Sequence, residues 1–331
     1  MDSRHRILFS YSNFSEMQPF TRQDFDILAS QYHLVPVFWT GRVRGLGDTG
    51  RLFASLVTCG MAYFDFAYEH AYRGVRASRL LGRPSVVRIA GFDVVEEEWA
   101  TGKFPSEWPR KLSRTLTDAD KLITCSEALR ERAMRYTSRR DIRVIPYGVD
   151  TERFRPGIAT RERLVLTTSY LRRDYIRRKG LQTFLDAART LQDFHFGIIG
   201  PDLDGTGMRL ESVAPPNVTL YGGVATTTLI NLLGRAQVYC QLSEHEGFGL
   251  ALAEAMAVGC TPVVTKRGAL PEVAGNAGIY VDYGDAAGTA RAIEEAALRP
   301  DLGKTARQRI VEYFSVELRR HRLLEVFEEL A

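Results

Sequence analysis

Short apolar runs rich in β-branched residues alternate with segments of helical period along the whole chain. In the first half, the apolar runs predict strands at residues 6–10, 34–39, 85–90, 121–124 and 143–146. The intervening segments predict helices at residues 21–31, 71–81, 107–118 and 127–135. Because this alternation is typical of parallel βαβ units, the first half is predicted to form a doubly wound parallel sheet.

The alternation breaks at 146–157, in the segment PYGVDTERFRPG, whose prolines and glycines follow neither period. It then restarts, with strands predicted at 164–169, 194–200, 218–221, 238–241, 261–265 and 279–281, and helices at 181–191, 227–235, 287–298, 302–313 and 316–330. The predicted fold class is α/β, with two Rossmann-like doubly wound domains facing a central cleft. The predicted parts are an N-terminal domain (1–148), a linker (149–160), a C-terminal domain (161–314) and a last helix (315–331) that packs back on the N-terminal domain.

Length and composition agree with a globular protein of two domains. The chain has 331 residues, of which 45% are hydrophobic and 25% charged, and a typical domain has about 150 residues. No apolar run approaches the ~18 residues of a membrane span, and the start MDSRHRILFS is interpreted as a polar lead rather than a signal peptide. The four cysteines contain no CxxC pair, which argues against a disulfide framework and a zinc site. We therefore expect a cytoplasmic protein.

The net charge of +4 lies entirely in the first 150 residues. Such an excess suits an anionic acceptor or a membrane surface, although a solvated arginine-rich surface explains it equally well. No GxGxxG follows a predicted strand, and neither HExxH nor GxSxG occurs. These absences disfavour nicotinamide-dependent enzymes, metalloproteases and serine hydrolases. We also expect no nucleic-acid partner.

The stretch SEHEGFGLALAEAMAVG (243–259) follows a predicted strand and contains the strongest candidate site. Its loop leads into a helix that we expect to begin at Phe248 or Gly249. A helix N-terminus presents free N–H groups and a positive dipole end, which favour phosphate. Gly247 and Gly249 lack Cβ atoms and so let a ligand approach the backbone closely.

Glu254 lies in the apolar part of this helix, where an unpaired buried carboxylate costs several kcal/mol. Gly247, Ala251 and Glu254 fall on one helical stripe. A ligand along that stripe meets two small residues and then a carboxylate that can accept hydrogen bonds from a ribose diol. Glu246, in the loop, points to whatever extends beyond the phosphates. The structural alternative is a buried helix whose two glutamates reach solvent.

With Glu246-GFGLALA-Glu254 followed by AMAVGCTPVV, the chain resembles the retaining glycosyltransferases of family 4, whose signature is Glu-x7-Glu. The resemblance implies the two-domain GT-B fold. It also implies that Glu254 binds the nucleotide ribose and that Glu246 contacts the transferred sugar. A second match is RRDYIRRKG (172–180), where the family holds the donor diphosphate with an arginine and a lysine. Lys179 aligns clearly, and Arg173 is the better partner than Arg172.

The resemblance implies an enzyme that moves a hexose, with retention, from a UDP- or GDP-sugar to a hydroxyl acceptor that is a glycan or lipid-linked. The implied catalytic residues are Glu246, Arg173 and Lys179. The implied donor-binding residues are Glu254, Gly247, Phe248, Gly249, Leu250 and Arg172. Two cations on a diphosphate suit a reaction without a metal or cofactor. Two alternatives stay open, a GT-B-fold sugar-nucleotide epimerase and a non-catalytic nucleotide-sugar-binding protein.

The first 120 residues follow the family only in outline. Many members have a Gly-Gly loop after the first strand, where this chain has SYSNFSEM, including Asn13. Many have a sugar-contacting histidine after the strand at 85–90, where this chain has RIAGFD and offers Asp93. An Asp after a glycine is also typical of a turn or a helix cap. With His245, these residues are candidates for the sugar and acceptor side. The basic N-terminal half also suits peripheral association with the inner face of a membrane.

Overall fold

The computed structural model describes residues 5–12, 17–40, 46–94, 106–158 and 160–330. By its internal contacts the chain divides into two units. The N-terminal unit contains Met1–Pro146 and Glu317–Ala331, and the C-terminal unit contains Tyr147–Val316. The described residues of the predicted linker (149–160) form no helix or strand and belong to the C-terminal unit.

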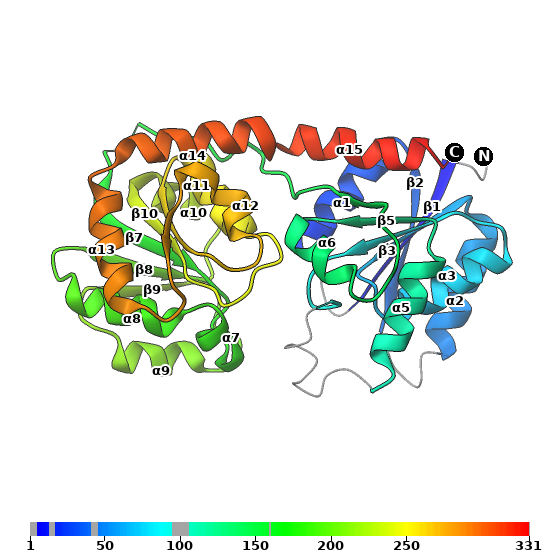
Figure 1. Ribbon diagram of the computed structural model, residues 1–331, viewed down its shortest axis with the longest axis horizontal. Helices are drawn as coiled ribbons and strands as arrows, with labels where there is room; N and C mark the ends of the chain where they lie inside the picture. The colour runs from blue at the N-terminus through cyan, green and yellow to red at the C-terminus, as the bar shows by residue number, and fades with distance from the viewer. Residues whose placement is uncertain (1–4, 13–16, 41–45, 95–105, 159, 331) are drawn as a thin grey trace. The chain divides into compact units, whose positions relative to one another are not determined.

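In the N-terminal unit, the described residues form a six-stranded parallel sheet in the order β2-β1-β3-β4-β5-β6 (Figure 1). Its strands are β1 (Arg6–Ser12), β2 (His33–Trp39), β3 (Met61–Asp65), β4 (Ser85–Ile89), β5 (Lys121–Thr124) and β6 (Ile142–Val144). Its helices are α1 (Pro19–Ala29), α2 (Leu46–Thr58), α3 (Glu69–Leu80), α5 (Trp108–Asp118), α6 (Glu127–Ala133) and α15 (Val316–Glu328). The predicted strands have counterparts here, but β3 was not predicted. Its run MAYFD contains no β-branched residue, unlike β4 (SVVRI) and β11 (TPVVT), which are equally buried and were predicted.

Helices cover both faces of this sheet (Figure 1). α1 and α15 pack on one face, where Ile27, Leu323 and Phe327 meet Phe9 and Tyr63 of the strands. α2 and α3 pack against the other face. The helix α15 is therefore part of the N-terminal core, although it comes last in the sequence.

Two aspartates and two arginines form a buried network that ties α15 to the N-terminal sheet. Arg319 of α15 donates from Nε to Asp24 of α1 at 2.8 Å, and from a terminal nitrogen to the carbonyl oxygen of Ile145 at 2.6 Å. Arg88 of β4 lies 3.3 Å from Asp24 and also pairs with Asp65. All four charged side chains are at most 2% exposed. Because a buried charge that loses its partner is strongly destabilising, the network fixes the position of α15 within this unit.

In the C-terminal unit, the described residues form a second six-stranded parallel sheet, in the order β12-β11-β10-β7-β8-β9. Its strands are β7 (Glu162–Thr168), β8 (His195–Ile199), β9 (Val218–Gly222), β10 (Ala236–Gln241), β11 (Thr261–Thr265) and β12 (Ile279–Val281). Its helices are α7 (Arg173–Arg178), α8 (Leu181–Thr190), α9 (Thr206–Val213), α10 (Thr226–Arg235), α11 (Leu250–Val258), α12 (Leu270–Ala274), α13 (Ala286–Ala297) and α14 (Pro300–Tyr313). The predicted strands at 261–265 and 279–281 are confirmed residue for residue.

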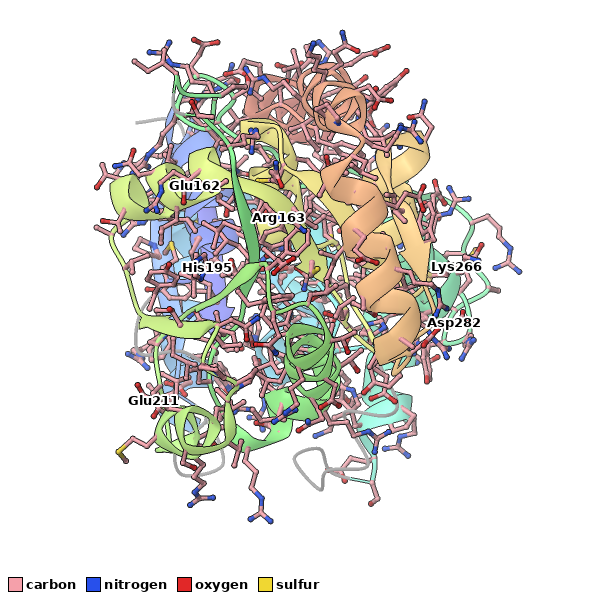
Figure 2. All side chains as sticks on the ribbon, turned by 90° about the vertical axis from the view of Figure 1, so that its left-hand side faces the viewer. Glu162, Arg163, His195, Glu211, Lys266 and Asp282 are labelled. Carbon is pink, nitrogen blue, oxygen red and sulfur yellow. The ribbon has the colours of Figure 1, made fainter. Side chains whose placement is uncertain are left out.

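The C-terminal sheet has helices on both faces, with α8 and α13 on one side and α11 and α14 on the other. Figure 2 labels residues at both ends of its strands. Glu162 and His195 begin β7 and β8, whereas Lys266 and Asp282 follow β11 and β12. The second pair thus marks the carboxyl edge of the sheet, where ligands of such sheets bind.

The four cysteines are free thiols in buried positions. No helix in the described part of the chain combines the length and the hydropathy of a membrane span.

Candidate functional site

The strand order of the C-terminal unit changes direction between β7 and β10. From β7 the chain moves outward through β8 to β9, then returns to β10 and moves the other way through β11 to β12. This is the order of the Rossmann sheet, whose ligands bind beyond the carboxyl ends of the strands at the change of direction. The segments that follow β7 (169–180) and β10 (242–249) contain most of the predicted site residues.

Gly180 brings the segment after β7 against the loop after β10. Its φ is +65°, and a Cβ atom there would lie 2.2 Å from the carbonyl oxygen of Leu242. A side chain at this position therefore requires the backbone to move. The N–H of Glu244 also donates to the carbonyl oxygen of Arg178 at 2.8 Å. Lys179, the C-cap residue of α7, is thus held beside the loop that contains the first signature glutamate.

Lys179 and Glu246 form a largely buried ion pair between Nζ and Oε1, with side chains 15% and 14% exposed. Burial by itself raises the pKa of Glu246, but the charge and hydrogen bond of Lys179, with the charge of Arg178, bring it below the ordinary value. The N–H of Ala269 donates to the carbonyl oxygen of Glu246 at 3.0 Å, and the preceding Gly268 permits this approach because a Cβ there would lie 2.3 Å from the same oxygen. Glu246 is therefore an ionised and firmly held carboxylate at neutral pH.

Glu254, by contrast, makes no hydrogen bond or ion pair with any described residue. It lies half-buried on α11, where burial raises its pKa to about 7 against the opposing charge of Arg153. The protein thus holds a carboxylate that it does not satisfy, and this is a physical signature of a binding group. Arg153 is exposed in the predicted linker and was not among the predicted site residues.

The two predicted arginines are not brought to the Lys179–Glu246 pair. Arg172 pairs with Asp174. Arg173 begins α7 with an exposed side chain, and its N–H donates to Asp204 at 3.1 Å. The arginine half of the predicted diphosphate clamp therefore stays a prediction.

The loop before α11 differs from its prediction in one respect. The helix begins at Leu250, and Gly249 precedes it in the left-handed region with a φ of +97°. Because this conformation is not helical, Gly247 lies outside the helix, and the predicted stripe through Gly247 and Glu254 is wrong. His245 lies half-buried in the same loop.

The side chain of Phe248 serves the core of the C-terminal unit. It is 4% exposed and packs edge-on against Tyr147 and Phe314, with ring centres 5.5 and 5.6 Å away. Only its backbone is left for a donor, together with the backbone groups of the neighbouring glycines. The backbone N–H groups at the start of α11 are therefore the candidates that donate hydrogen bonds to the donor phosphates.

Asp93 closes a turn in the N-terminal unit. It is fully buried and accepts hydrogen bonds from the N–H groups of Gly91 at 2.8 Å and Ala67 at 3.0 Å. Burial raises its pKa, and these backbone hydrogen bonds oppose the shift. The geometry therefore supports the turn role rather than contact with a sugar. Asn13, the other candidate in this unit, lies outside the described residues.

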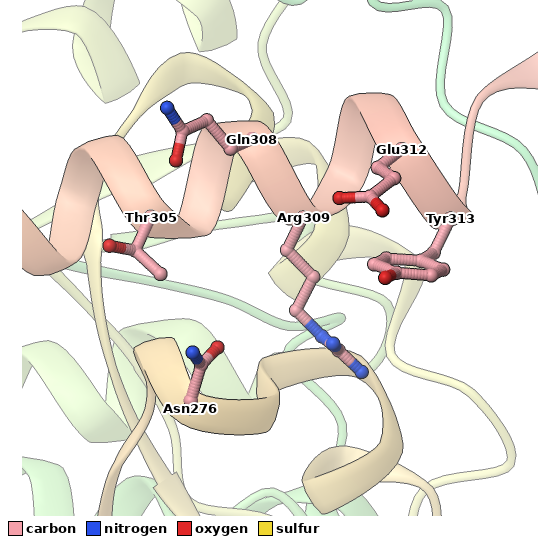
Figure 3. A pocket seen from close by; sticks show the side chains of 6 residues that line it. All are labelled: Asn276, Thr305, Gln308, Arg309, Glu312 and Tyr313. Atoms are coloured by element: carbon pink, nitrogen blue, oxygen red, sulfur yellow. The ribbon is translucent and has the colours of Figure 1, made fainter.

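A separate pocket of about 380 Å³ lies between α14 and the 3₁₀ turn Gly275–Ala277 (Figure 3). Arg309 points into it and donates to the carbonyl oxygens of Glu272 and Val273 at 2.7 and 2.9 Å. The other lining residues are Asn276, Thr305, Gln308, Glu312 and Tyr313. None of the predicted site residues lines this pocket.

Comparison with known families covers both units. Residues 162–298 match the family described as Glycosyl transferases group 1, and residues 64–153 match Glycosyltransferase Family 4. The first match contains Lys179, Glu246 and Glu254. The chain belongs to glycosyltransferase family 4.

Two curated relatives of this family 4 glycosyltransferase are named mannosyltransferases. An MMP alpha-(1->4)-mannosyltransferase of Mycolicibacterium hassiacum is 28% identical over 270 residues, which are 77% of this chain and 61% of that protein. A GDP-mannose:cellobiosyl-diphosphopolyprenol alpha-mannosyltransferase of Komagataeibacter xylinus is 26% identical over 57% of this chain and 50% of that protein. The family 4 chain thus matches about three fifths or less of the length of these relatives.

Solved structures resemble the family 4 chain along nearly its whole length. Anabaena HepE, solved with UDP and glucose, has a TM-score of 0.80 at 17% identity and covers 98% of this chain and 100% of that one. A sucrose-phosphate synthase of Thermosynechococcus elongatus has a TM-score of 0.79 at 18% identity over 98% and 99% of the two chains. At these identities the likeness establishes the fold alone, which is the GT-B fold.

Three polar side chains on β10 and the loop that follows were not among the predicted site residues of this glycosyltransferase. Tyr239, Gln241 and Ser243 occupy alternate positions, and all are buried. Polar residues at every second position of an otherwise apolar strand were the signal that could have revealed them. No group of three His, Cys, Asp or Glu side chains suited to a metal occurs in the described part of the chain. Metal independence stays a prediction.

Proposed function

We propose that this chain transfers a hexose from a nucleoside diphosphate sugar to a hydroxyl acceptor with retention of configuration. The observation that carries the proposal is the pairing of two unlike carboxylates on the carboxyl side of β10. Glu246 is ionised and held by Lys179, whereas Glu254 is half-buried with no partner among the described residues. The phosphates of an anionic donor could engage the lysine, and its ribose diol would satisfy Glu254.

Each group has a defined chemical task in this proposal. Lys179 and Arg173 stabilise the negative charge that develops on the departing diphosphate, with help from the N–H groups that begin α11. Glu254 accepts hydrogen bonds from the ribose hydroxyls. Glu246 accepts hydrogen bonds from the hydroxyls of the sugar and so orients it for attack. We assign no general base.

Named activities of the relatives support the donor class and the stereochemistry. The K. xylinus relative is named for GDP-mannose and an alpha linkage, and Anabaena HepE is solved with UDP-glucose. These names favour GDP- and UDP-sugars as the first donors to test. We expect a cytoplasmic enzyme, because these donors are cytoplasmic metabolites, and a glycan or lipid-linked acceptor.

Binding of UDP, GDP and their hexose conjugates is measured first, by titration calorimetry. The melting temperature gives a second readout, because a ligand that binds only the native state raises it. Activity is then measured as donor consumption with a panel of glycan and lipid-linked acceptors. The anomeric proton of the product in an NMR spectrum distinguishes retention from inversion. Appearance of an epimerised sugar nucleotide without acceptor would favour the epimerase alternative. Donor binding without any turnover on the panel would favour the non-catalytic alternative.

We also propose that the N-terminal unit associates peripherally with an anionic membrane through α2. The exposed side of this helix has Gly50, Phe53, Ala54 and Val57 at helical spacing. Phe53 is 44% exposed and Val57 is 52% exposed. Exposed arginines occur on α2 and on the adjacent α3, namely Arg51, Arg76 and Arg79, of which Arg51 pairs with Asp48 and Arg79 with Asp118. An apolar stripe with cationic neighbours is the pattern of a helix that lies in a bilayer interface.

Sedimentation with phosphatidylglycerol and phosphatidylcholine vesicles tests this surface. The wild type is expected to sediment with the anionic vesicles only, and Phe53→Ser with Val57→Ser should abolish the binding. Val213→Ser is the matched control, since Val213 is 57% exposed on α9 of the other unit. Equal binding by the double variant and the wild type would contradict the assignment to α2.

A further inference from the structure

The strand β10 has one face that is apolar and one that is polar. Val238 and Cys240 point into the hydrophobic core that α8 and α13 cover. Tyr239 and Gln241 occupy the alternate positions, and Ser243 continues the same spacing into the loop. These three are at most 3% exposed. Since buried polar groups are costly unless they are hydrogen-bonded, the polar side chains on this face must have hydrogen-bond partners.

Hydrogen bonds along this face have one direction. The Tyr239 hydroxyl donates to Gln241 Oε1 at 3.2 Å, so the amide nitrogen of Gln241 faces the other way. Gln241 Nε2 donates to Ser243 Oγ at 3.0 Å and to Glu246 Oε1 at 2.9 Å. The Ser243 hydroxyl, which accepts from the amide, donates its own proton to Glu246 Oε1 at 3.0 Å. The chain of donors therefore ends on the first signature glutamate.

The two oxygens of Glu246 are consequently not equivalent. Oε1 receives Lys179 Nζ, Gln241 Nε2 and Ser243 Oγ. Among the described residues, none donates to Oε2. One oxygen is thus saturated by the protein, and the other is left for a ligand.

Resting on the function proposed above, we propose that Gln241 is a positioning residue, which holds Glu246 so that Oε2 faces the hydroxyls of the donor sugar. Lys179 cannot do this alone, because the donor diphosphate competes for its ammonium group. Gln241 and Ser243 are neutral and buried, so an anionic ligand does not draw them away. The amide and the hydroxyl thus keep the carboxylate in place while the lysine engages the phosphates.

Gln241→Met tests the proposal, because it keeps the length of the side chain and removes both ends of the hydrogen-bonded chain. The value of kcat/KM, for transfer or for slow hydrolysis of the donor, should fall about 10- to 100-fold, as expected for a hydrogen bond to a charged group. The Kd of the nucleoside diphosphate, which lacks the sugar, should stay at the wild-type value. Gln237→Met, at the start of the same strand, is the matched control and should leave both values unchanged.

Gln241→Glu gives a second, pH-dependent signature. An ionised Glu at this position repels Glu246, whereas a protonated one can donate a hydrogen bond as the amide does. The activity of this variant, relative to the wild type at the same pH, should therefore recover as the pH falls. The ratio of variant to wild-type activity at each pH cancels the titration of Glu254, which both proteins share. It also cancels the effect of the Lys179 and Arg178 charges on Glu246, because both charges are present in both proteins. The Gln241→Met variant should show no such recovery.

Three outcomes decide the matter. An unchanged kcat/KM in Gln241→Met overturns the positioning role and leaves the proposed transferase function standing. A parallel loss of nucleoside diphosphate binding also overturns it, because the residue then serves the fold of the whole site. A wild-type protein that neither binds nor consumes any nucleotide sugar removes the proposed function and this inference with it.

Discussion

Replacing Glu254 by glutamine should make the protein more stable at neutral pH and, at the same time, a weaker binder of its nucleotide. Burial raises the pKa of Glu254 to about 7 from the ordinary 4.5. The folded protein therefore holds the proton more tightly than the unfolded chain does, so ionising this group lowers the free energy of unfolding. The cost is absent below about pH 4.5, grows as the pH rises and is complete above about pH 7.

The size of the effect follows from the shift. A difference of about 2.5 pK units, at about 1.4 kcal/mol per unit, gives ~3.5 kcal/mol as an upper value. Glu254→Gln removes the ionisation and keeps the shape of the side chain. We therefore expect the variant to be more stable than the wild type by up to ~3.5 kcal/mol at pH 8, and by little at pH 4.5.

Urea unfolding between pH 4.5 and 8 measures this difference. All three tryptophans belong to the N-terminal unit, so their fluorescence does not report on α11. The unfolding is better followed by far-UV circular dichroism, with hydrogen exchange of the α11 peptide as the local probe. Glu211→Gln, at an exposed position on α9, makes the same chemical change without burial and should alter stability little at any pH.

A stability difference that is the same at pH 4.5 and pH 8 would refute the reasoning, because the gain must follow the ionisation of Glu254. Ligand affinity should change in the opposite direction to stability. The variant should bind the nucleoside diphosphate about 10- to 100-fold more weakly, since it loses a charged hydrogen-bond acceptor for the ribose. The wild-type affinity should itself fall as the pH drops below about 7. Unchanged affinity would leave the stability argument intact and remove the ribose role.

Three further predictions test other parts of the structure. Lys179→Met should lower kcat/KM about 10²- to 10³-fold by loss of charge stabilisation in the transition state, and near-normal steady-state kinetics would contradict the phosphate role. Gly180→Ala should lower the free energy of unfolding by about 1–3 kcal/mol, because its φ and its close backbone neighbour exclude a Cβ. Gly234→Ala, where a Cβ meets nothing within 4 Å, should be neutral or stabilising in the same chemical denaturation. Arg319→Met should destabilise the N-terminal unit by about 3–5 kcal/mol, seen by tryptophan fluorescence, because it leaves a buried aspartate short of a partner; a variant with wild-type stability would show the network to be unimportant.

Much of the fold could be predicted because local pattern and tertiary structure agree there. Strands such as 121–124 and 261–265 are short apolar runs between clear helical segments, and they have the predicted bounds. The strand β3 could not be found in this way. It is as buried as the strand 261–265, but its run MAYFD has no Val, Ile or Thr, so no β-branched residues mark it as a strand.

The candidate site was predictable where chemistry demands particular residues at a particular spacing. Glu246 and Glu254 stand out because a carboxylate beside or within an apolar helix is costly without a partner. The role of Asp93 could not be decided in this way, because an aspartate after a glycine suits both a ligand site and a turn. Only the contacts with two backbone N–H groups show that its carboxylate is used by the fold.

By itself, therefore, the sequence determined the α/β class, the family resemblance and the pair of glutamates, since these depend on residue type and local spacing. The tertiary structure decided which groups meet across segments that are distant in the chain. It brought Lys179 to Glu246 through the close approach at Gly180, and it ended the chain of donors from Tyr239 and Gln241 on one oxygen of that glutamate. These relations depend on strand order and on the direction of each side chain, which no local pattern in the sequence encodes.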